Sequence, residues 1–326
     1  MKLFTRQRIS WVISLPLMIL AMTSAPLAAP ITGDLLVQSQ TPGAISYEVT
    51  EYLADGSALQ TFVPVAAPAS SDLWHPRDLV IADNGNVHVF NGTFDPYLST
   101  YDSAADTWTH VTHTGWSTIN NISYGGIATL GDRVFVTNMS TAGKSASGGV
   151  VFDTALGTSV GFASGIQAID LNLGLDGNLW LLEGGIAYAY DPTGLNLLGS
   201  VSLAAAGGDV RALAVDGLGD FFVATWDGLV AHLASDGTLI DSLQLNDSLT
   251  DIDLSANGVL AIGSRSEGAW LSTTDLNAAT QVASGRWNYF VALAPSEVPL
   301  PGTLVLLSLG IGMLVTPARS ARRHRY

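Results

Sequence analysis

Residues 77–90 read RDLVIADNGNVHVF: an apolar strand, a polar turn around a glycine, and a second apolar strand. Four later stretches repeat this plan: GIATLGDRVFVTN (126–138), IDLNLGLDGNLWLLE (169–183), RALAVDGLGDFFVAT (211–225) and TDIDLSANGVLAIGS (250–264). The turn glycines are 46, 46, 42 and 39 residues apart: Gly85, Gly131, Gly177, Gly219 and Gly258. Glycine at such a position is typical of a tight β-hairpin, because it accepts positive φ without strain.

A second polar turn and further apolar strands follow within most units, such as IAYAY at 186–190. Four strands in about 40–45 residues predict a propeller blade rather than a β-sandwich. Residues 288–296 read as a first strand without a successor, and residues 33–66 as strands two to four without a predecessor. We therefore predict an all-β, six-bladed β-propeller over residues 30–295, closed by strands from both termini. A seven-bladed ring or a β-helix is the alternative.

Charge is distributed unevenly along the chain. All 28 acidic residues lie between Asp34 and Glu297, whereas only six of the 13 lysines and arginines fall in residues 30–297, giving that body a charge of 6 − 28 = −22. Such a surface repels nucleic acid and anionic lipid, so we expect neither as a partner. The chain has no cysteine, so packing and strand pairing must stabilise it without disulfides.

The N-terminus has the three parts of a secretory signal peptide, which we place at residues 1–29. Lys2, Arg6 and Arg8 precede an apolar run from Ile9 to Met22, and small residues at 25–29 suit a cleavage site. The apolar run is shorter than the roughly 20 residues of a membrane-spanning helix. An uncleaved N-terminal anchor is the alternative.

The C-terminus, residues 296–326, has a proline motif, a short apolar stretch and a basic tail. The motif is Val298, Pro299 and Pro301, the apolar stretch is 303–316, and the tail carries Arg319, Arg322, Arg323 and Arg325. This order resembles the PEP-CTERM sorting domain of Gram-negative bacteria, although Leu300 stands where the commonest motif has Glu. The resemblance implies transient membrane contact, processing by an exosortase-type protease, and delivery to the cell envelope, outer surface or a biofilm matrix. A plain tail anchor is the alternative.

The repeats themselves resemble NHL-type six-bladed propellers over roughly residues 33–295, a fold that serves many functions. Alignment on the turn glycines places Asp78, Asp170 and Asp251 at one register, seven residues before the glycine, with Tyr124 and Ala212 there in the other two units. Arg77 and Arg211 lie one residue earlier. These residues should face one another at one mouth of the central channel, where they would suit Ca²⁺ or a polar, sugar-like ligand. Alternatively, each Asp only accepts backbone hydrogen bonds where its strand begins.

Two functional classes remain open at this point. The first is a non-catalytic binding protein of the cell surface, in contact with exopolysaccharide or other surface proteins. The second is an exported, metal-dependent hydrolase or lyase of the lactonase type, with its site in the channel. The sequence has no phosphate loop or nucleotide fingerprint, and it identifies no catalytic residue or resident cofactor. The first class is therefore favoured.

Overall fold

A computed structural model of the chain describes residues 35–40, 47–53, 55–62, 76–91, 97–112, 122–140 and 148–294. The predicted signal peptide (1–29) and sorting segment (296–326), with its apolar stretch 303–316, lie outside these residues. Within the described ranges, no helix is long and apolar enough to cross a membrane.

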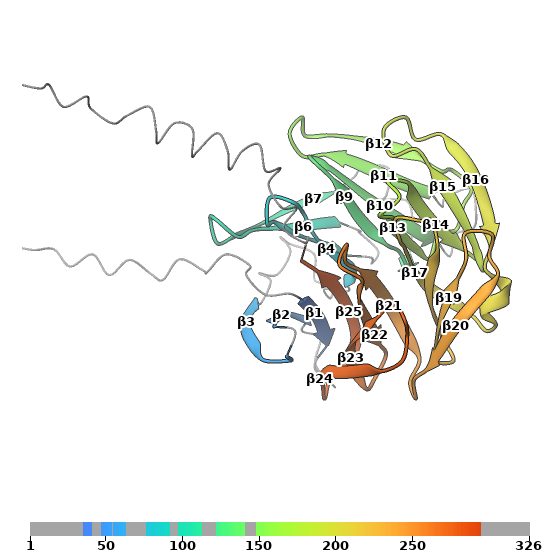
Figure 1. The fold of residues 1–326 in the computed structure, drawn as a ribbon. Helices are drawn as coiled ribbons and strands as arrows, with labels where there is room; N and C mark the ends of the chain where they lie inside the picture. Colours follow the sequence, from blue (N-terminus) through green and yellow to red (C-terminus); the bar gives the residue numbers. More distant parts are fainter. Residues whose placement is uncertain are drawn as a thin grey trace, which may run out of the picture.

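The described chain forms six antiparallel sheets, each a blade of a propeller (Figure 1). Blade 1 contains β4 (Pro76–Ile81), β5 (Val87–Asn91), β6 (Tyr97–Asp102) and β7 (Thr107–Thr112). Blade 2 contains β8 (Ile122–Tyr124), β9 (Ile127–Leu130), β10 (Arg133–Ser140), β11 (Gly148–Asp153) and β12 (Thr158–Phe162). Blade 3 contains β13 (Asp170–Leu173), β14 (Leu179–Glu183), β15 (Ile186–Tyr190) and β16 (Leu197–Ser202).

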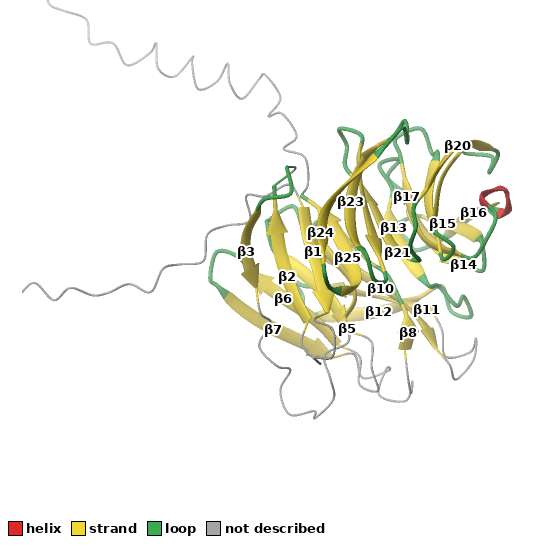
Figure 2. Cartoon of the chain, turned by 90° about the horizontal axis from the view of Figure 1, so that it is seen from below, coloured by secondary structure: helices red, strands yellow, loops and turns green. Residues whose placement is uncertain are grey.

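Blade 4 contains β17 (Val210–Val215), β18 (Phe221–Thr225), β19 (Leu229–Leu233) and β20 (Leu239–Gln244). Blade 5 contains β21 (Leu249–Leu254), β22 (Val259–Ser264), β23 (Gly268–Thr273) and β24 (Ala279–Ser284). Blade 6 contains β25 (Trp287–Leu293), β1 (Leu35–Gln40), β2 (Tyr47–Tyr52) and β3 (Ala58–Phe62). A short 3₁₀ helix, η2 (Ala204–Ala206), joins blades 3 and 4 and is coloured red in Figure 2.

Blade 6 confirms the predicted closure by strands from both ends of the body. β25 pairs antiparallel with β1, so that Leu293 lies opposite Leu35 and Val291 opposite Val37. The innermost strands then contact one another in a closed ring, in the order β4, β9, β13, β17, β21 and β25. Closure joins the first and last strands of the body within one sheet, which removes the two free ends that an open ring of blades would have.

The hydrophobic core lies between blades rather than within them. Six buried clusters each join one blade to the next. Between blades 3 and 4, for example, Trp180 of β14 packs edge-on against Phe221 of β18, with ring centroids 4.9 Å apart. The apolar surface that these six interfaces remove from water stabilises the ring.

One predicted register is wrong. We expected Tyr124 to stand in blade 2 where Asp78 stands in blade 1, but Gly126 holds that place, because Ile127 and Leu79 are the residues that follow it in each innermost strand. Blade 1 turns through Asp83–Gly85, closed by a hydrogen bond from Ala82 N to Asn86 O, whereas blade 2 turns through only Gly131 and Asp132. The glycine is third in the first turn and first in the second, so alignment on glycine shifted blade 2 by two residues.

Candidate functional site

Three innermost strands carry a β-bulge close to their first residue. In β4, Pro76 pairs with Asn91 and Asp78 with Phe90, which leaves Arg77 as the extra residue. Arg211 of β17 and Thr250 of β21 are the extra residues in the same way. A bulge turns its extra side chain away from the normal alternation of the strand. Here all three bulged residues line one cavity at the mouth of the channel.

This mouth cavity has a volume of about 340 Å³, near the lower end of the range of about 300–1,000 Å³ for small-molecule pockets. Its polar side chains come from five of the six blades. The lining residues are Tyr47, Pro76, Arg77, Asp78, Gly125, Ile169, Asp170, Arg211, Trp226, Leu249, Thr250, Asp251, Arg265, Asn288 and Phe290. The five residues predicted for the channel mouth, Asp78, Asp170, Asp251, Arg77 and Arg211, are all among them.

Arginines form the walls of the mouth cavity. Arg77 belongs to blade 1 and Arg211 to blade 4, so they approach from opposite sides of the six-bladed ring. The guanidinium carbons of Arg211 and Arg265 lie 4.9 and 5.3 Å from the ring centroid of Trp226, within the range of cation–π attraction. Arg211 also forms an ion pair with Asp209. Trp226 therefore holds two guanidinium groups at one side of the cavity.

Asp78, Asp170 and Asp251, which we call the floor carboxyls, are hydrogen-bonded to the backbone edges of the innermost strands. Asp78 accepts from Leu79 N of its own strand at 2.7 Å and from Ile127 N of blade 2 at 2.9 Å. Asp170 does the same with Leu171 and Leu213, and Asp251 with Ile252 and Val291. Three carboxyls in alternate blades thus satisfy six edge N–H groups, which would otherwise face the channel unpaired.

Burial raises the pKa of all three floor carboxyls, because the charged form is poorly solvated inside the ring. For Asp170, burial raises the pKa to about 7. Burial also holds the pKa of Asp78 and of Asp251 well above the usual range, with repulsion among the three carboxyls as a further cause. The backbone donors act in the opposite direction, since they favour the ionised form.

Asn288 completes the mouth cavity from blade 6. Its φ of +50° lies in the left-handed region, which costs energy for most residues but least for asparagine and glycine. Its side chain donates to Gln40 Oε1 at 2.9 Å. Asn288 therefore lines the cavity with its amide held in place by Gln40.

A second cavity of about 290 Å³ lies on the other side of the floor carboxyls. It is lined by the ends of the innermost strands and their turns, including Asp83, Asp253 and Leu293. Nowhere in the described residues do three His, Cys, Asp or Glu side chains converge as metal ligands do. The carboxyls that suggested Ca²⁺ therefore do not form a calcium site with one another.

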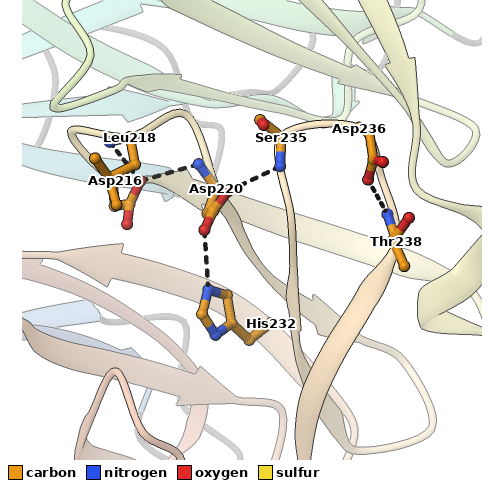
Figure 3. Close-up of polar contacts among 7 residues, drawn as sticks. All are labelled: Asp216, Leu218, Asp220, His232, Ser235, Asp236 and Thr238. Atoms are coloured by element: carbon orange, nitrogen blue, oxygen red, sulfur yellow. Dashed lines mark hydrogen bonds and ion pairs between the residues drawn. The ribbon is translucent and has the colours of Figure 1, made fainter.

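A further group of polar side chains lies at two turns of blade 4, between β17 and β18 and between β19 and β20 (Figure 3). Asp216 accepts from the backbone of Leu218 and Asp220, and Asp220 accepts from Ser235 N at 2.8 Å. His232 Nε2 lies 3.7 Å from Asp220 Oδ2, and its ring stacks on Phe222. These contacts fix two hairpin turns against each other, so we assign the group a structural role.

Among the lining residues that were not identified from the sequence, Trp226 and Arg265 matter most, because they hold one side of the mouth together with Arg211. Trp226 and Arg265 each follow the last residue of the second strand of a blade, Thr225 in blade 4 and Ser264 in blade 5. If the blades are aligned on the last residues of their second strands instead of on the turn glycines, Trp226 and Arg265 fall at the same position of their blades.

No protein-family model matches the sequence, and no curated protein matches it. Among solved structures, a streptogramin B lyase has a TM-score of 0.52 at 14% identity, covering 78% of this chain and 85% of that one. A catalytically inactive virginiamycin B lyase from Staphylococcus aureus with quinupristin has a TM-score of 0.51 at 10% identity, covering 82% and 87%.

BamB from Moraxella catarrhalis matches with a TM-score of 0.41 at 14% identity, over 67% of this chain. This chain spans 64% of the length of that BamB chain. At such a TM-score the match carries no argument, and at such identities the two lyases show likeness of fold only. The all-β, six-bladed propeller is thus what the geometry and the comparisons support together.

Proposed function

We propose that this chain is an exported propeller of the cell surface or extracellular matrix that binds a small anionic ligand in the mouth cavity, without chemistry on it. One observation carries the binding proposal. Of the six basic residues in residues 30–297, three, namely Arg77, Arg211 and Arg265, line this single cavity. The same stretch carries 28 acidic residues.

Electrostatics explains why this placement matters. A cleft with walls of low dielectric concentrates the field of its charges, so three guanidinium groups in one mouth attract an anion that the rest of the surface repels. Guanidinium groups also bind carboxylates and phosphates through two parallel hydrogen bonds. A non-catalytic role fits the floor carboxyls, whose oxygens already accept backbone N–H groups.

Export is proposed from the two ends of the sequence, with an exosortase-type protease as processing partner and a Gram-negative cell envelope, surface or matrix as destination. The course of β25 is compatible with attachment through the C-terminus. Asn288, near its start, lines the mouth cavity, whereas Leu293 and Ala294 line the cavity at the opposite end. The described part of the chain therefore ends, at Ala294, at the opposite end from the arginines, and we propose that attachment through the C-terminus leaves the mouth open to polysaccharide or surface proteins.

Thermal unfolding of the purified full-length protein tests the binding proposal. At low salt, acetate, phosphate and hexuronates would be added singly, with neutral sugars for comparison. At least one anion should raise the unfolding midpoint, because a ligand of the native state stabilises it by mass action. The rise should shrink with added salt and in an Arg211→Gln/Arg265→Gln variant. If no anion stabilises the wild type more than this variant, the binding proposal is wrong.

Export needs a separate test. A C-terminal tag should be lost during pulse-labelling in a host that has an exosortase and retained in a host without one. A tag retained in both hosts would contradict processing and would leave the binding proposal unaffected.

A further inference from the structure

We propose that the ligand of the mouth cavity is a hexuronate, taken as a single sugar or as the terminal unit of an acidic polysaccharide. This inference rests on the proposed binding function and names its ligand.

The charge of the lining favours a ligand with one negative charge. Arg77, Arg211 and Arg265 bring three positive charges, but Arg211 is already paired with Asp209. The floor carboxyls lie directly beneath, and burial holds the pKa of each well above its usual range, so the floor carries less negative charge than three ordinary aspartates would. A carboxylate brings one negative charge, which the two guanidinium groups beside Trp226 can meet.

The two sides of the cavity suit the two ends of a hexuronate. On the side of blades 4 and 5, Arg211 and Arg265 are held by Trp226, with guanidinium carbons 4.9 and 5.3 Å from its ring centroid. Two oriented guanidinium groups match the two oxygens of one carboxylate. Arg77 lies on the opposite side of the propeller, in blade 1. It can donate to the hydroxyl and ring oxygens of the sugar at the end away from the carboxylate.

The remaining lining provides for sugar hydroxyls and C–H groups. Each floor carboxyl oxygen that accepts one backbone N–H keeps another acceptor position. The Thr250 hydroxyl, which donates to Tyr289 O, and the Asn288 amide, which donates to Gln40 Oε1, each keep a further hydrogen-bonding position. Pro76, Ile169 and Phe290 supply apolar surface. Polar groups at fixed points on an otherwise apolar wall are the usual composition of a specific small-molecule site.

The position of the cavity limits how a polymer can enter. Six innermost strands surround it, and the floor carboxyls stand between it and the opposite cavity. An internal unit would have to enter together with both of its neighbours, and about 340 Å³ does not hold three sugar rings and their substituents. A polysaccharide is therefore bound by its end.

Isothermal titration calorimetry on the full-length protein at low salt tests the inference. Galacturonate and glucuronate should bind, while galactose, glucose and the methyl ester of galacturonate should bind at least tenfold more weakly. Short and long oligogalacturonates should show the same affinity per chain, since each chain has one end of the right kind. Affinity that rises in proportion to chain length would overturn end recognition.

Variants locate the site. Arg265→Gln changes an exposed side chain, so the protein should still fold, while its affinity for uronates should fall at least tenfold. Arg265→Lys keeps the positive charge but loses the two parallel N–H donors of the guanidinium group, so its loss of affinity should be intermediate. Arg286→Gln is the matched control, because Arg286 pairs with Glu48 at 2.7 Å and does not line the cavity. Uronate binding that survives Arg265→Gln unchanged would overturn the assignment.

The two proposals fail differently. If phosphate or another anion binds in an Arg265-dependent manner and uronates do not, the hexuronate inference is wrong and the binding function stands. If no small anion binds at all, both are wrong.

Discussion

The buried carboxyl of Asp170 should make the stability of the propeller depend on pH. Its pKa is about 7 in the folded protein against 3.8 as an ordinary aspartate, because of burial. The folded state therefore holds this proton more tightly than the unfolded chain does. The resulting stability is fully present below pH 3.8 and is lost as pH rises through 7. At about 1.4 kcal/mol per pKa unit the full loss is about 4 kcal/mol, of which about 3 kcal/mol falls between pH 5 and pH 8.

Asp170→Asn removes this titration and keeps the shape of the side chain. The amide oxygen can still accept from Leu213 N, which lies 2.7 Å from Asp170 Oδ2, but the amide NH₂ cannot accept from Leu171 N. At pH 5 the variant should be less stable than the wild type by about 1–3 kcal/mol, the cost of an unsatisfied buried donor. At pH 8 it should be as stable as the wild type or more so, because it avoids the buried charge.

Urea unfolding of the full-length wild type and variant at pH 5, 6, 7 and 8 measures the effect. The difference in unfolding free energy between them should change by at least about 3 kcal/mol over this range, and by more where Asp170 also raises the pKa of Asp251. Asp241→Asn, at an exposed position of β20, serves as control and should run parallel to the wild type. If Asp170→Asn also runs parallel, the reasoning from burial is refuted.

Three further predictions concern packing, a buried amide and metal ions. Gly126→Ala would place Cβ 2.1 Å from Leu171 N, so urea unfolding should show that the free energy of unfolding falls by about 2–4 kcal/mol. The control is Gly161→Ala, where the nearest atom to the added Cβ is 3.8 Å away and the free energy of unfolding should fall by less than about 1 kcal/mol. Equal losses in the two variants would contradict the packing argument. Gln38 is fully buried and neither of its side-chain polar atoms has a described partner, so Gln38→Met should raise the free energy of unfolding by about 1–3 kcal/mol; a decrease would indicate a polar contact of Gln38 outside the described residues. Calcium or a chelator should leave the unfolding midpoint unchanged, because no three described carboxylates converge; a rise lost in an Asp78→Ala/Asp170→Ala/Asp251→Ala variant would show a calcium site.

The blade count could be predicted because each blade carries its own local signals. Apolar runs give the strands, and polar turns with glycines such as Gly85 and Gly258, both at positive φ, separate them. The sixth blade followed from incomplete strand sets at the two ends of the body, and the pairing of β25 with β1 confirms it. These signals depend on neighbouring residues, so a single sequence contains them.

Details of the mouth could not be predicted in full, because they depend on register between segments far apart in the chain. Because the turn of blade 2 is shorter, alignment on its glycine assigned Tyr124 to the position that Gly126 holds. Nothing in the sequence of that blade alone reveals this shift. The bulges at Arg77, Arg211 and Thr250 are visible only in the strand pairing. Trp226 and Arg265 directly follow the second strands of blades 4 and 5, and only the arrangement of the blades in the ring brings them together at the mouth.

The two alternatives for the aspartates, backbone capping and a place in the site, turn out to be compatible. Capping explains why aspartate occurs only in alternate blades, since one carboxyl has two oxygens and serves the edge N–H groups of two blades. Gly126, Ala212 and Phe290 can then occupy the intervening positions without leaving a donor unpaired. Capping of strand edges by the aspartates does not explain the arginines, which gather above the floor although residues 30–297 carry only six basic residues. The arginines are therefore the residues that point to a ligand, and the carboxyls set the charge of the floor on which it lies.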